Sequence, residues 1–475
     1  MQNVVGRISE ITSLRNMYES DRAEFVALYG RRRVGKTFLV NEMFRNHFVF
    51  KMTGVIEGTL EDQFLAFTDA MDDYGLALAK RPDNWMEAFM MLKKALKAKM
   101  KPDEKCVIFI DELPAMDVQN SGVAKALGYF WNQWASLQPN LLLIICGSAT
   151  SWMITNVVNS KGGLHGRLTC EMPIHPFCLS EVEEYLTKNG FLWNRQMVLQ
   201  AYMIFGGIPY YLSLLNKHES LVQNVDRLLF SQDMLMRREY RRLFSTLYRS
   251  PEVYMKIVET LGVYQQGLTR QQLAEKLGCP NNGHLGTKLE DLVYCDLLRR
   301  LPVRGKRIKK NDAIYQLKDF FCGFFLKFAR RAEVEPNYWS HHINTPEVNT
   351  WMGLTFENVC TEHVREIKHA LRIDAISTLN YSWRSKESLP GAQIDIVIER
   401  ADGIVNICEV KYSATKYDLG KDEYAKIKNR VKVFRDETVL RHVPWVTIIA
   451  AEGLSDGKYN DVAQSILTLD DLFQR

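Results

Sequence analysis

Gly30-Arg-Arg-Arg-Val-Gly35-Lys36-Thr37 is the stretch that decides the fold, because it lies between an apolar strand, 25–29, and a helical pattern, 38–44. The two glycines let the backbone wrap closely enough for successive N–H groups to point at phosphate oxygens, and the positive end of the following helix favours the anion. In such a loop the lysine reaches the β- and γ-phosphates and the threonine offers its hydroxyl to Mg²⁺. The stretch therefore predicts nucleotide and Mg²⁺ binding by Gly30, Gly35, Lys36 and Thr37.

A second apolar strand, 106–110, ends in Asp111 and Glu112. A continuous apolar run suits a strand buried on both faces of a parallel sheet, and open parallel sheets place ligands at the carboxyl ends of their strands. We expect Asp111 to hold Mg²⁺ through water, and Glu112 to orient or deprotonate the attacking water. Without the loop at Gly30, a solvated strand end would be the better interpretation of this pair.

A third strand, 141–146, is followed by Gly147 and Ser148. From this position a hydroxyl can sense the γ-phosphate or the attacking water, which makes Ser148 a candidate catalytic residue. A helix N-cap by Ser148 or Thr150 is the alternative.

Further on, Gly166-Arg167 ends a glycine-rich segment. Arg167 can act as an arginine finger, within one subunit or across the interface of a homo-oligomer. The alternative is a lone surface arginine.

Composition sets the frame for these motifs. The chain has 475 residues, 46% of them hydrophobic, and a net charge of +5, which predicts about three globular domains but identifies no partner. Its apolar runs are far shorter than the ~20 residues of a membrane helix, and the N-terminus lacks a secretory pattern. We therefore expect a cytoplasmic protein without a membrane partner. Nine cysteines without a C-x-x-C pair indicate reduced core thiols.

The middle of the chain carries a helix-turn-helix pattern. Thr269 is the expected N-cap of a helix that ends at Gly278, and a further helical run covers about 282–298. The basic segment 299–310, followed by a strand at 313–317, is typical of a β-wing. A winged helix usually binds duplex DNA, whose phosphates lysine and arginine neutralise. A rigid connector between domains is the alternative that stays open.

The C-terminal quarter contains a hairpin pattern, in which runs 391–399 and 404–411 flank a turn at Asp402. If the turn is centred on Asp402, Asp395 lies opposite Glu409, and Lys411 shares a face with Glu409. Glu357, on an upstream helical run, is available to join them. Such a set can bind Mg²⁺ through Glu357, Asp395 and Glu409 and activate water against a phosphodiester, with Lys411 orienting the water. A salt-bridged hairpin surface is the alternative.

The order of the motifs resembles the archaeal-type AAA+ ATPases, relatives of the STAND signalling ATPases. The resemblance rests on Val5-Gly6-Arg7 with Glu10, the loop at Gly30, Ile110-Asp-Glu-Leu-Pro114, Gly147-Ser-Ala-Thr, Gly166-Arg167 with Pro176-Phe177, and Gly206-Gly-Ile-Pro209. It implies that Arg7 and Pro209 contact the nucleotide, with Pro209 in a helical lid. ATP is the expected nucleotide, since no guanine-reading Asn-Lys-x-Asp motif is present.

The hairpin region resembles the PD-(D/E)xK nuclease core and the DUF234-type domain attached to such ATPases. Glu357, Asp395, Glu409 and Lys411 match the helix Glu, strand Asp and Glu-x-Lys positions of that core.

The predicted fold class is α/β, with a P-loop NTPase parallel sheet, a helical lid, a winged helix and a C-terminal restriction-endonuclease-like domain. The expected ranges are 1–175 for the ATPase core, 176–235 for the lid, 250–318 for the winged helix, 319–350 for a linker helix and 351–475 for the nuclease-like domain. The leading functional hypothesis is an ATPase that couples nucleotide state to DNA binding and Mg²⁺-dependent phosphodiester cleavage. The alternatives are a non-cleaving, ATP-switched regulator of DNA or protein binding and a signalling ATPase that does not touch nucleic acid.

Overall fold

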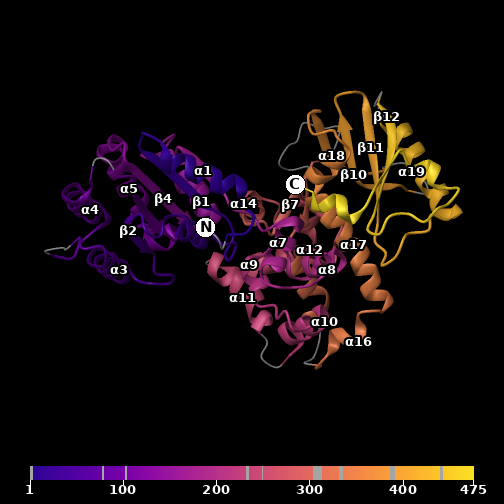
Figure 1. Cartoon of the computed structure of the whole chain (residues 1–475), viewed down its shortest axis with the longest axis horizontal. Helices are drawn as coiled ribbons and strands as arrows, with labels where there is room; N and C mark the ends of the chain where they lie inside the picture. The colour runs from indigo at the N-terminus through magenta and orange to yellow at the C-terminus, as the bar shows by residue number, and fades with distance from the viewer. Residues whose placement is uncertain are drawn as a thin grey trace. The chain divides into compact units, whose positions relative to one another are not determined.

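The computed structural model describes residues 4–76, 80–101, 104–231, 235–248, 250–302, 313–330, 335–385, 391–438 and 442–474 (Figure 1). The chain forms two compact units. The first contains residues 1–176, 243–251 and 294–296, and the second contains residues 177–242, 252–293 and 297–475.

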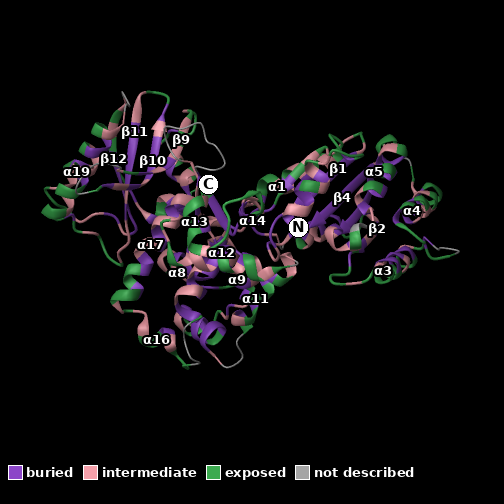
Figure 2. Cartoon of the chain, turned by 180° about the vertical axis from the view of Figure 1, so that it is seen from behind, coloured by how far each residue is buried: buried purple, intermediate pink, exposed green. Residues whose placement is uncertain are grey.

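The first unit is built on a five-stranded parallel sheet with the strand order β2-β3-β4-β1-β5. Its strands are β1 (Glu24–Tyr29), β2 (Phe48–Thr53), β3 (Cys106–Asp111), β4 (Leu141–Gly147) and β5 (Cys170–Pro173). Every residue of β3 and β4 is buried, as expected for central strands of a parallel sheet (Figure 2). The three apolar runs of the sequence therefore form the strands that we predict from them.

Six α-helices belong to the described part of this unit: α1 (Ile8–Glu19), α2 (Lys36–Phe44), α3 (Leu60–Asp73), α4 (Trp85–Lys99), α5 (Val123–Gln133) and α6 (Thr150–Met153). The apolar faces of α3, α4 and α5 share one core with the strands, in which Phe67, Leu92 and Leu127 are fully buried. This core fixes the carboxyl edge of the sheet, where β1, β3 and β4 end.

The second unit begins with α7 (Leu179–Lys188), α8 (Arg195–Phe205), α9 (Pro209–Ser213) and α10 (Leu221–Val225), followed by a π-helical turn, Asp226–Phe230. Next come α11 (Leu235–Leu247), which extends past residue 242 into the first unit, and α12 (Pro251–Val263). Helix α15 (Phe320–Phe324) packs against α8 and continues as a π-helical turn, Phe325–Ala329. A short helix, α16 (Tyr338–His342), precedes the C-terminal domain.

A small module lies between these helices: β6 (Leu268–Thr269), α13 (Arg270–Leu277), α14 (Gly283–Tyr294), β7 (Leu298–Leu301) and β8 (Ile314–Leu317). Its strands form an antiparallel sheet in the order β6-β8-β7. As predicted, Thr269 caps α13 by accepting a hydrogen bond from the Gln272 N–H, and Gly278 ends the helix in the left-handed region. Most of the predicted wing, 303–312, lies outside the described residues, so the winged helix stays a prediction.

The C-terminal part of the second unit contains a mixed five-stranded sheet in the order β13-β12-β11-β10-β9. Its strands are β9 (Thr378–Arg384), β10 (Gln393–Arg400), β11 (Ile404–Lys411), β12 (Val443–Ala450) and β13 (Ser465–Leu467); its helices are α17 (Pro346–Glu362), α18 (Val364–Ala370) and α19 (Lys421–Glu437). Helix α17 contacts β10 and β11, and α19 buries Val433 and Phe434 against the sheet. Because α17 is continuous across residue 350, it bridges the place where we expect the nuclease-like domain to begin.

Candidate functional sites

The loop after β1 has the backbone that a phosphate-binding loop needs. Gly30 has φ +145°, and a Cβ atom there would lie 2.2 Å from the Ile174 carbonyl oxygen, so no other residue fits without a shift of the backbone. Gly35, at φ +91° in the left-handed region, is the N-cap residue of α2. The Lys36 ammonium group is buried and donates to the carbonyl oxygens of Gly30 at 2.8 Å and Arg31 at 2.9 Å. These bonds hold the Lys36 ammonium group against the backbone of the loop that precedes it.

The two predicted magnesium ligands of the first unit meet. The Thr37 hydroxyl donates to Asp111 Oδ2 over 2.8 Å, and Asp111 is the last residue of β3, with 3% of its surface exposed. Asp111 Oδ1 also accepts the Glu112 N–H at 3.0 Å. A hydroxyl and a carboxylate are oxygen ligands that Mg²⁺ accepts, so this pair fits the cation in its chemistry.

Glu112 and Ser148 also come together, at the ends of β3 and β4. Glu112 Oε2 accepts hydrogen bonds from the Ser148 hydroxyl at 2.8 Å and from its backbone N–H at 3.1 Å. Glu112, directly after the last residue of β3, has φ +48° and lies in the left-handed region. The N-cap alternative is wrong, because α6 begins at Thr150 without a side-chain cap. The serine hydroxyl therefore acts on the predicted general base.

The remaining predicted nucleotide residues lie in different environments. Arg7 is buried, and its guanidinium donates to the carbonyl oxygens of Val34 at 3.1 Å and His175 at 2.5 Å, so it supports the loop through backbone atoms. Arg167 is exposed on the first unit. Pro209 is the first residue of α9, in the second unit. The nucleotide contacts of Arg7, Arg167 and Pro209 therefore stay predictions.

In the second unit, the predicted hairpin forms with the expected register. Ile396 pairs with Cys408 and Val397 with Ile407, so the ladder is centred on Asp402, and Asp395 and Glu409 directly follow its outermost pair. The pairing of β10 with β9 is irregular between Ile394 and Val397. The Asp395 carboxylate accepts a hydrogen bond from the Gln393 amide at 2.8 Å. Glu357 lies on α17, which contacts both strands.

Two residues that the sequence reasoning missed complete this cluster, and both come from α19. Glu409 binds Lys411 at 2.9 Å and Arg430 at 2.6 Å, and Glu423 binds Lys411 at 2.7 Å. Glu423, Ile427 and Arg430 follow one another at spacings of four and three residues, the pattern of one helix face. Because Ile427 is buried, that spacing was the signal that Glu423 and Arg430 face the sheet.

The carboxylates of Glu357, Asp395 and Glu409 repel one another but are not arranged as a metal site. Burial, followed by repulsion from Asp395 and Glu409, raises the pKa of Glu357 to about 8, although Lys411 and Arg430 oppose the shift. Within the part of the chain that the structure describes, no three His, Cys, Asp or Glu side chains are grouped to hold a metal ion. In this cluster Glu409 is paired with Lys411 and Arg430. The oxygen atoms of the three carboxylates suit a divalent cation, but Glu409 can bind one only after its ion pair with Lys411 or Arg430 breaks.

Two of these three carboxylates open into a cavity of about 590 Å³ in the second unit. Glu357 and Asp395 line one part of it, and Arg299 on β7 and Trp383 and Arg384 on β9 line others. The pair is therefore accessible to a molecule that enters this cavity.

Comparisons with known proteins find two family matches, the first of which extends beyond residue 176 into the second unit. Residues 4–215 match the family described as an ATPase domain predominantly from Archaea, and residues 326–427 match a family of archaeal and bacterial proteins of unknown function, DUF234. The chain therefore carries an archaeal-type ATPase domain on a P-loop-like parallel sheet, followed by a DUF234 domain. The resemblance to these two families is confirmed, whereas the nuclease-like character of the second stays a prediction.

One curated relative is the uncharacterized protein MJECL04 of Methanocaldococcus jannaschii, 24% identical over 369 residues that cover 76% of this chain and 77% of the relative. Among solved structures, a Walker-type ATPase of Pyrococcus abyssi is 17% identical and covers 68% of this chain and 96% of its own, with a TM-score of 0.45. The ORC2 protein of Aeropyrum pernix is 12% identical and covers 77% and 98%, with a TM-score of 0.40. No helix among the described residues is long and apolar enough to cross a membrane.

Proposed function

We propose that the chain binds and hydrolyses ATP in its first unit. One observation carries this proposal: the carboxyl ends of β1, β3 and β4 bring the loop lysine, a Thr37–Asp111 pair and a Glu112–Ser148 pair to one edge of a parallel sheet. Phosphoryl transfer to water needs a phosphate cradle, a cation site and a group that orients water, and these residues supply all three.

The chain's own residues take distinct roles in this reaction. Lys36 exchanges its bonds to the loop carbonyls for the β- and γ-phosphates, and the N–H groups at the start of α2 hold the phosphates. Thr37 and Asp111 would hold Mg²⁺, which neutralises charge on the phosphates when it is bound. Glu112 accepts a proton from the attacking water, and Ser148 orients the Glu112 carboxylate.

Steady-state ATP hydrolysis tests this proposal. Glu112→Gln should lower kcat by about 10²–10⁴-fold while ATP still binds, because it removes the proton acceptor but leaves the groups that hold the phosphates. Lys36→Ala should weaken ATP binding itself. Glu61→Gln, an exposed carboxylate with 80% of its side chain accessible, serves as the matched control and should behave as wild type. Wild-type turnover in Glu112→Gln would exclude Glu112 as the base.

We further propose that the C-terminal domain cleaves a DNA phosphodiester with Mg²⁺ as cofactor. The proposal is supported by three observations: Asp395 and Glu409 follow the outermost pair of one ladder, both act electrostatically on Glu357 together with Lys411, and Glu357 and Asp395 line one cavity. A bound cation would lower the pKa of the attacking water. Lys411, already against Glu409, can then orient that water or stabilise the developing negative charge.

Nicking of supercoiled plasmid tests the cleavage. Asp395→Ala and Lys411→Ala should both abolish nicking and leave ATP hydrolysis intact, since they lie in the other unit. Asp456→Ala, an exposed carboxylate in a bend of the same domain, should nick as wild type does. The cleavage proposal fails if the wild type cuts no DNA with either Mg²⁺ or Mn²⁺.

The second candidate function is a non-cleaving regulator whose DNA or protein binding ATP switches. One observation favours it: the bonds from Lys411 and Arg430 occupy both Glu409 oxygens, as in a structural ion-pair cluster. Under this function, Glu409→Gln leaves salt-dependent DNA binding unaffected and no metal-dependent cleavage exists to be abolished.

A further inference from the structure

A basic hollow of about 440 Å³ lies beside α11 in the second unit. Its described lining includes Arg237, Arg238 and Arg241, which share one face of the helix, and Arg330, which pairs with Glu259 at 3.2 Å. Tyr240, stacked on Phe325 with ring centroids 4.4 Å apart, fixes the helix beneath them. Four arginines and one glutamate give this hollow a net positive charge.

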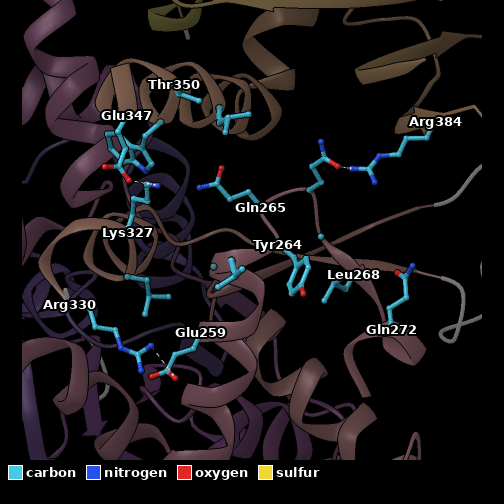
Figure 3. Close-up of a pocket in the computed structure, with 17 residues that line it drawn as sticks. Glu259, Tyr264, Gln265, Leu268, Gln272, Lys327, Arg330, Glu347, Thr350 and Arg384 are labelled. Carbon is cyan, nitrogen blue, oxygen red and sulfur yellow. Dashed lines mark hydrogen bonds and ion pairs between the residues drawn. The ribbon is translucent and has the colours of Figure 1, made fainter. Parts of the chain in front are cut away.

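A larger hollow, of about 1030 Å³, follows directly and shares Glu259 and Arg330 with the first. In Figure 3 the Tyr264 ring and the Gln265 amide lie between two ion pairs, Arg330–Glu259 and Lys327–Glu347, and Arg384 on the other side. Tyr264 has 37% of its surface exposed. This hollow therefore contains an aromatic ring and amide groups between two ion pairs and one arginine, and the Lys276 ammonium lies 5.0 Å from the centroid of the Tyr264 ring.

The cavity at the carboxylates is the third in the series. It shares Gln265, Gln266 and Arg384 with the large hollow and contains Glu357 and Asp395. Along the series the charged lining changes from four arginines and one glutamate in the first hollow to two arginines and three carboxylates in the third. Because each hollow shares lining residues with the next, a polyanion bound at the arginines can extend through the large hollow to Glu357 and Asp395.

We propose that a single nucleic-acid strand lies along these three hollows, with phosphates on the α11 arginines, a base on Tyr264 and one phosphodiester at Glu357 and Asp395. This inference rests on the proposed cleavage for its last contact only. Proteins that hold single strands combine a basic groove with aromatic rings on which bases stack, and both features occur here in order. The glutamine amides of the large hollow can bond base edges or sugar oxygens.

Fluorescence anisotropy of the full chain with labelled oligothymidylate of about 20 nucleotides, in EDTA to prevent cleavage, tests the path. Arg238→Ala with Arg241→Ala should weaken binding about tenfold or more at moderate salt and reduce the slope of log K against log[salt] by about 0.7 for each phosphate that the variant no longer neutralises. Arg365→Ala, an exposed arginine on α18 that lines none of these hollows, is the matched control and should keep wild-type affinity and slope.

Tyr264 gives a second, independent readout. Tyr264→Ala should weaken strand binding about 5–100-fold with an unchanged salt slope, because it removes the stacking of a base but no phosphate partner, whereas Tyr264→Phe should bind as wild type. Thermal melts show whether each variant is folded. Unchanged affinity in both the arginine and the Tyr264→Ala variants, or tighter binding of a duplex of the same length, would overturn the inference. Strand binding with the expected variant effects but without cleavage in Mg²⁺ would leave the path standing and refute only the nuclease.

Discussion

At the scale of single residues, Glu357 is the clearest source of a pH effect. Its folded-state pKa of about 8 lies above the ordinary value of 4.5, so the folded state holds this proton more tightly than the unfolded state. Its contribution to stability is therefore complete below pH 4.5 and is lost as pH rises through about 8.

Glu357→Gln keeps a neutral group at this place and should remove that pH dependence. We expect thermal unfolding to show the wild type losing stability relative to the variant between pH 5 and pH 9, by a few kcal/mol at most. Addition of Mg²⁺ at pH 8 should stabilise the wild type more than the variant, since a cation relieves the repulsion. Glu347→Gln, at the exposed start of the same helix, should follow the wild-type profile. Parallel profiles for Glu357→Gln and wild type would show that this carboxyl does not titrate in this range.

At the scale of elements, a buried ion cluster joins β7 to α17. Arg299, 9% exposed, binds Glu362 at 2.9 Å, and Lys318 binds the other oxygen of Glu362 at 3.1 Å. Burial alone would raise the pKa of Glu362, but Lys318 and Arg299 together lower it. The Arg299 guanidinium also donates to Gln316 at 2.8 Å. The cluster therefore ties the small three-stranded module to the helix that carries Glu357.

Arg299→Met should destabilise the protein by about 3–5 kcal/mol, because it leaves a largely buried carboxylate short of a partner. Its neighbour gives a matched control. Arg300, 36% exposed, pairs with Glu290 at 3.1 Å, and Arg300→Met should cost less than about 1 kcal/mol. Chemical denaturation, followed through the unfolding transition of the second unit, measures the loss of stability in both variants. An equal loss of stability in the two variants would contradict the role of Arg299 in holding the three-stranded module against α17.

The elements also show how far sequence reasoning reaches. Continuous apolar runs predicted β1, β3 and β4, and the symmetric turn predicted an antiparallel ladder centred on Asp402, because these signals are local. The pairing of Asp395 with Glu409 stays a prediction. The contacts of Glu409 with Arg430 were not predicted, since they depend on how α19 packs on the sheet, 21 residues away. The three hollows were missed for the same reason, since their lining comes from segments between Arg237 and Thr438.

At the scale of the whole molecule, the two units carry different chemistry: phosphate-loop residues in the first, and carboxylates with a basic path in the second. A nucleotide can control the second unit only if it binds differently to two states of the chain. Any such coupling is reciprocal, because the free energy that links two binding equilibria is shared by both. The proposed switch can therefore be measured as the factor by which each ligand changes the Kd of the other.

We expect a non-hydrolysable ATP analogue to change the Kd for single-stranded DNA by about 5–150-fold, the range of a coupling free energy of 1–3 kcal/mol. The same DNA should then change the Kd for the analogue by the same factor, in titrations at one salt concentration. Lys36→Ala should abolish both effects while retaining the DNA affinity of the nucleotide-free wild type, since it lies in the first unit and the proposed path lies in the second. Arg365→Ala should keep both. If the analogue leaves DNA affinity unchanged in the wild type, the ATPase and the C-terminal domain act independently, and ATP switches something other than nucleic-acid binding.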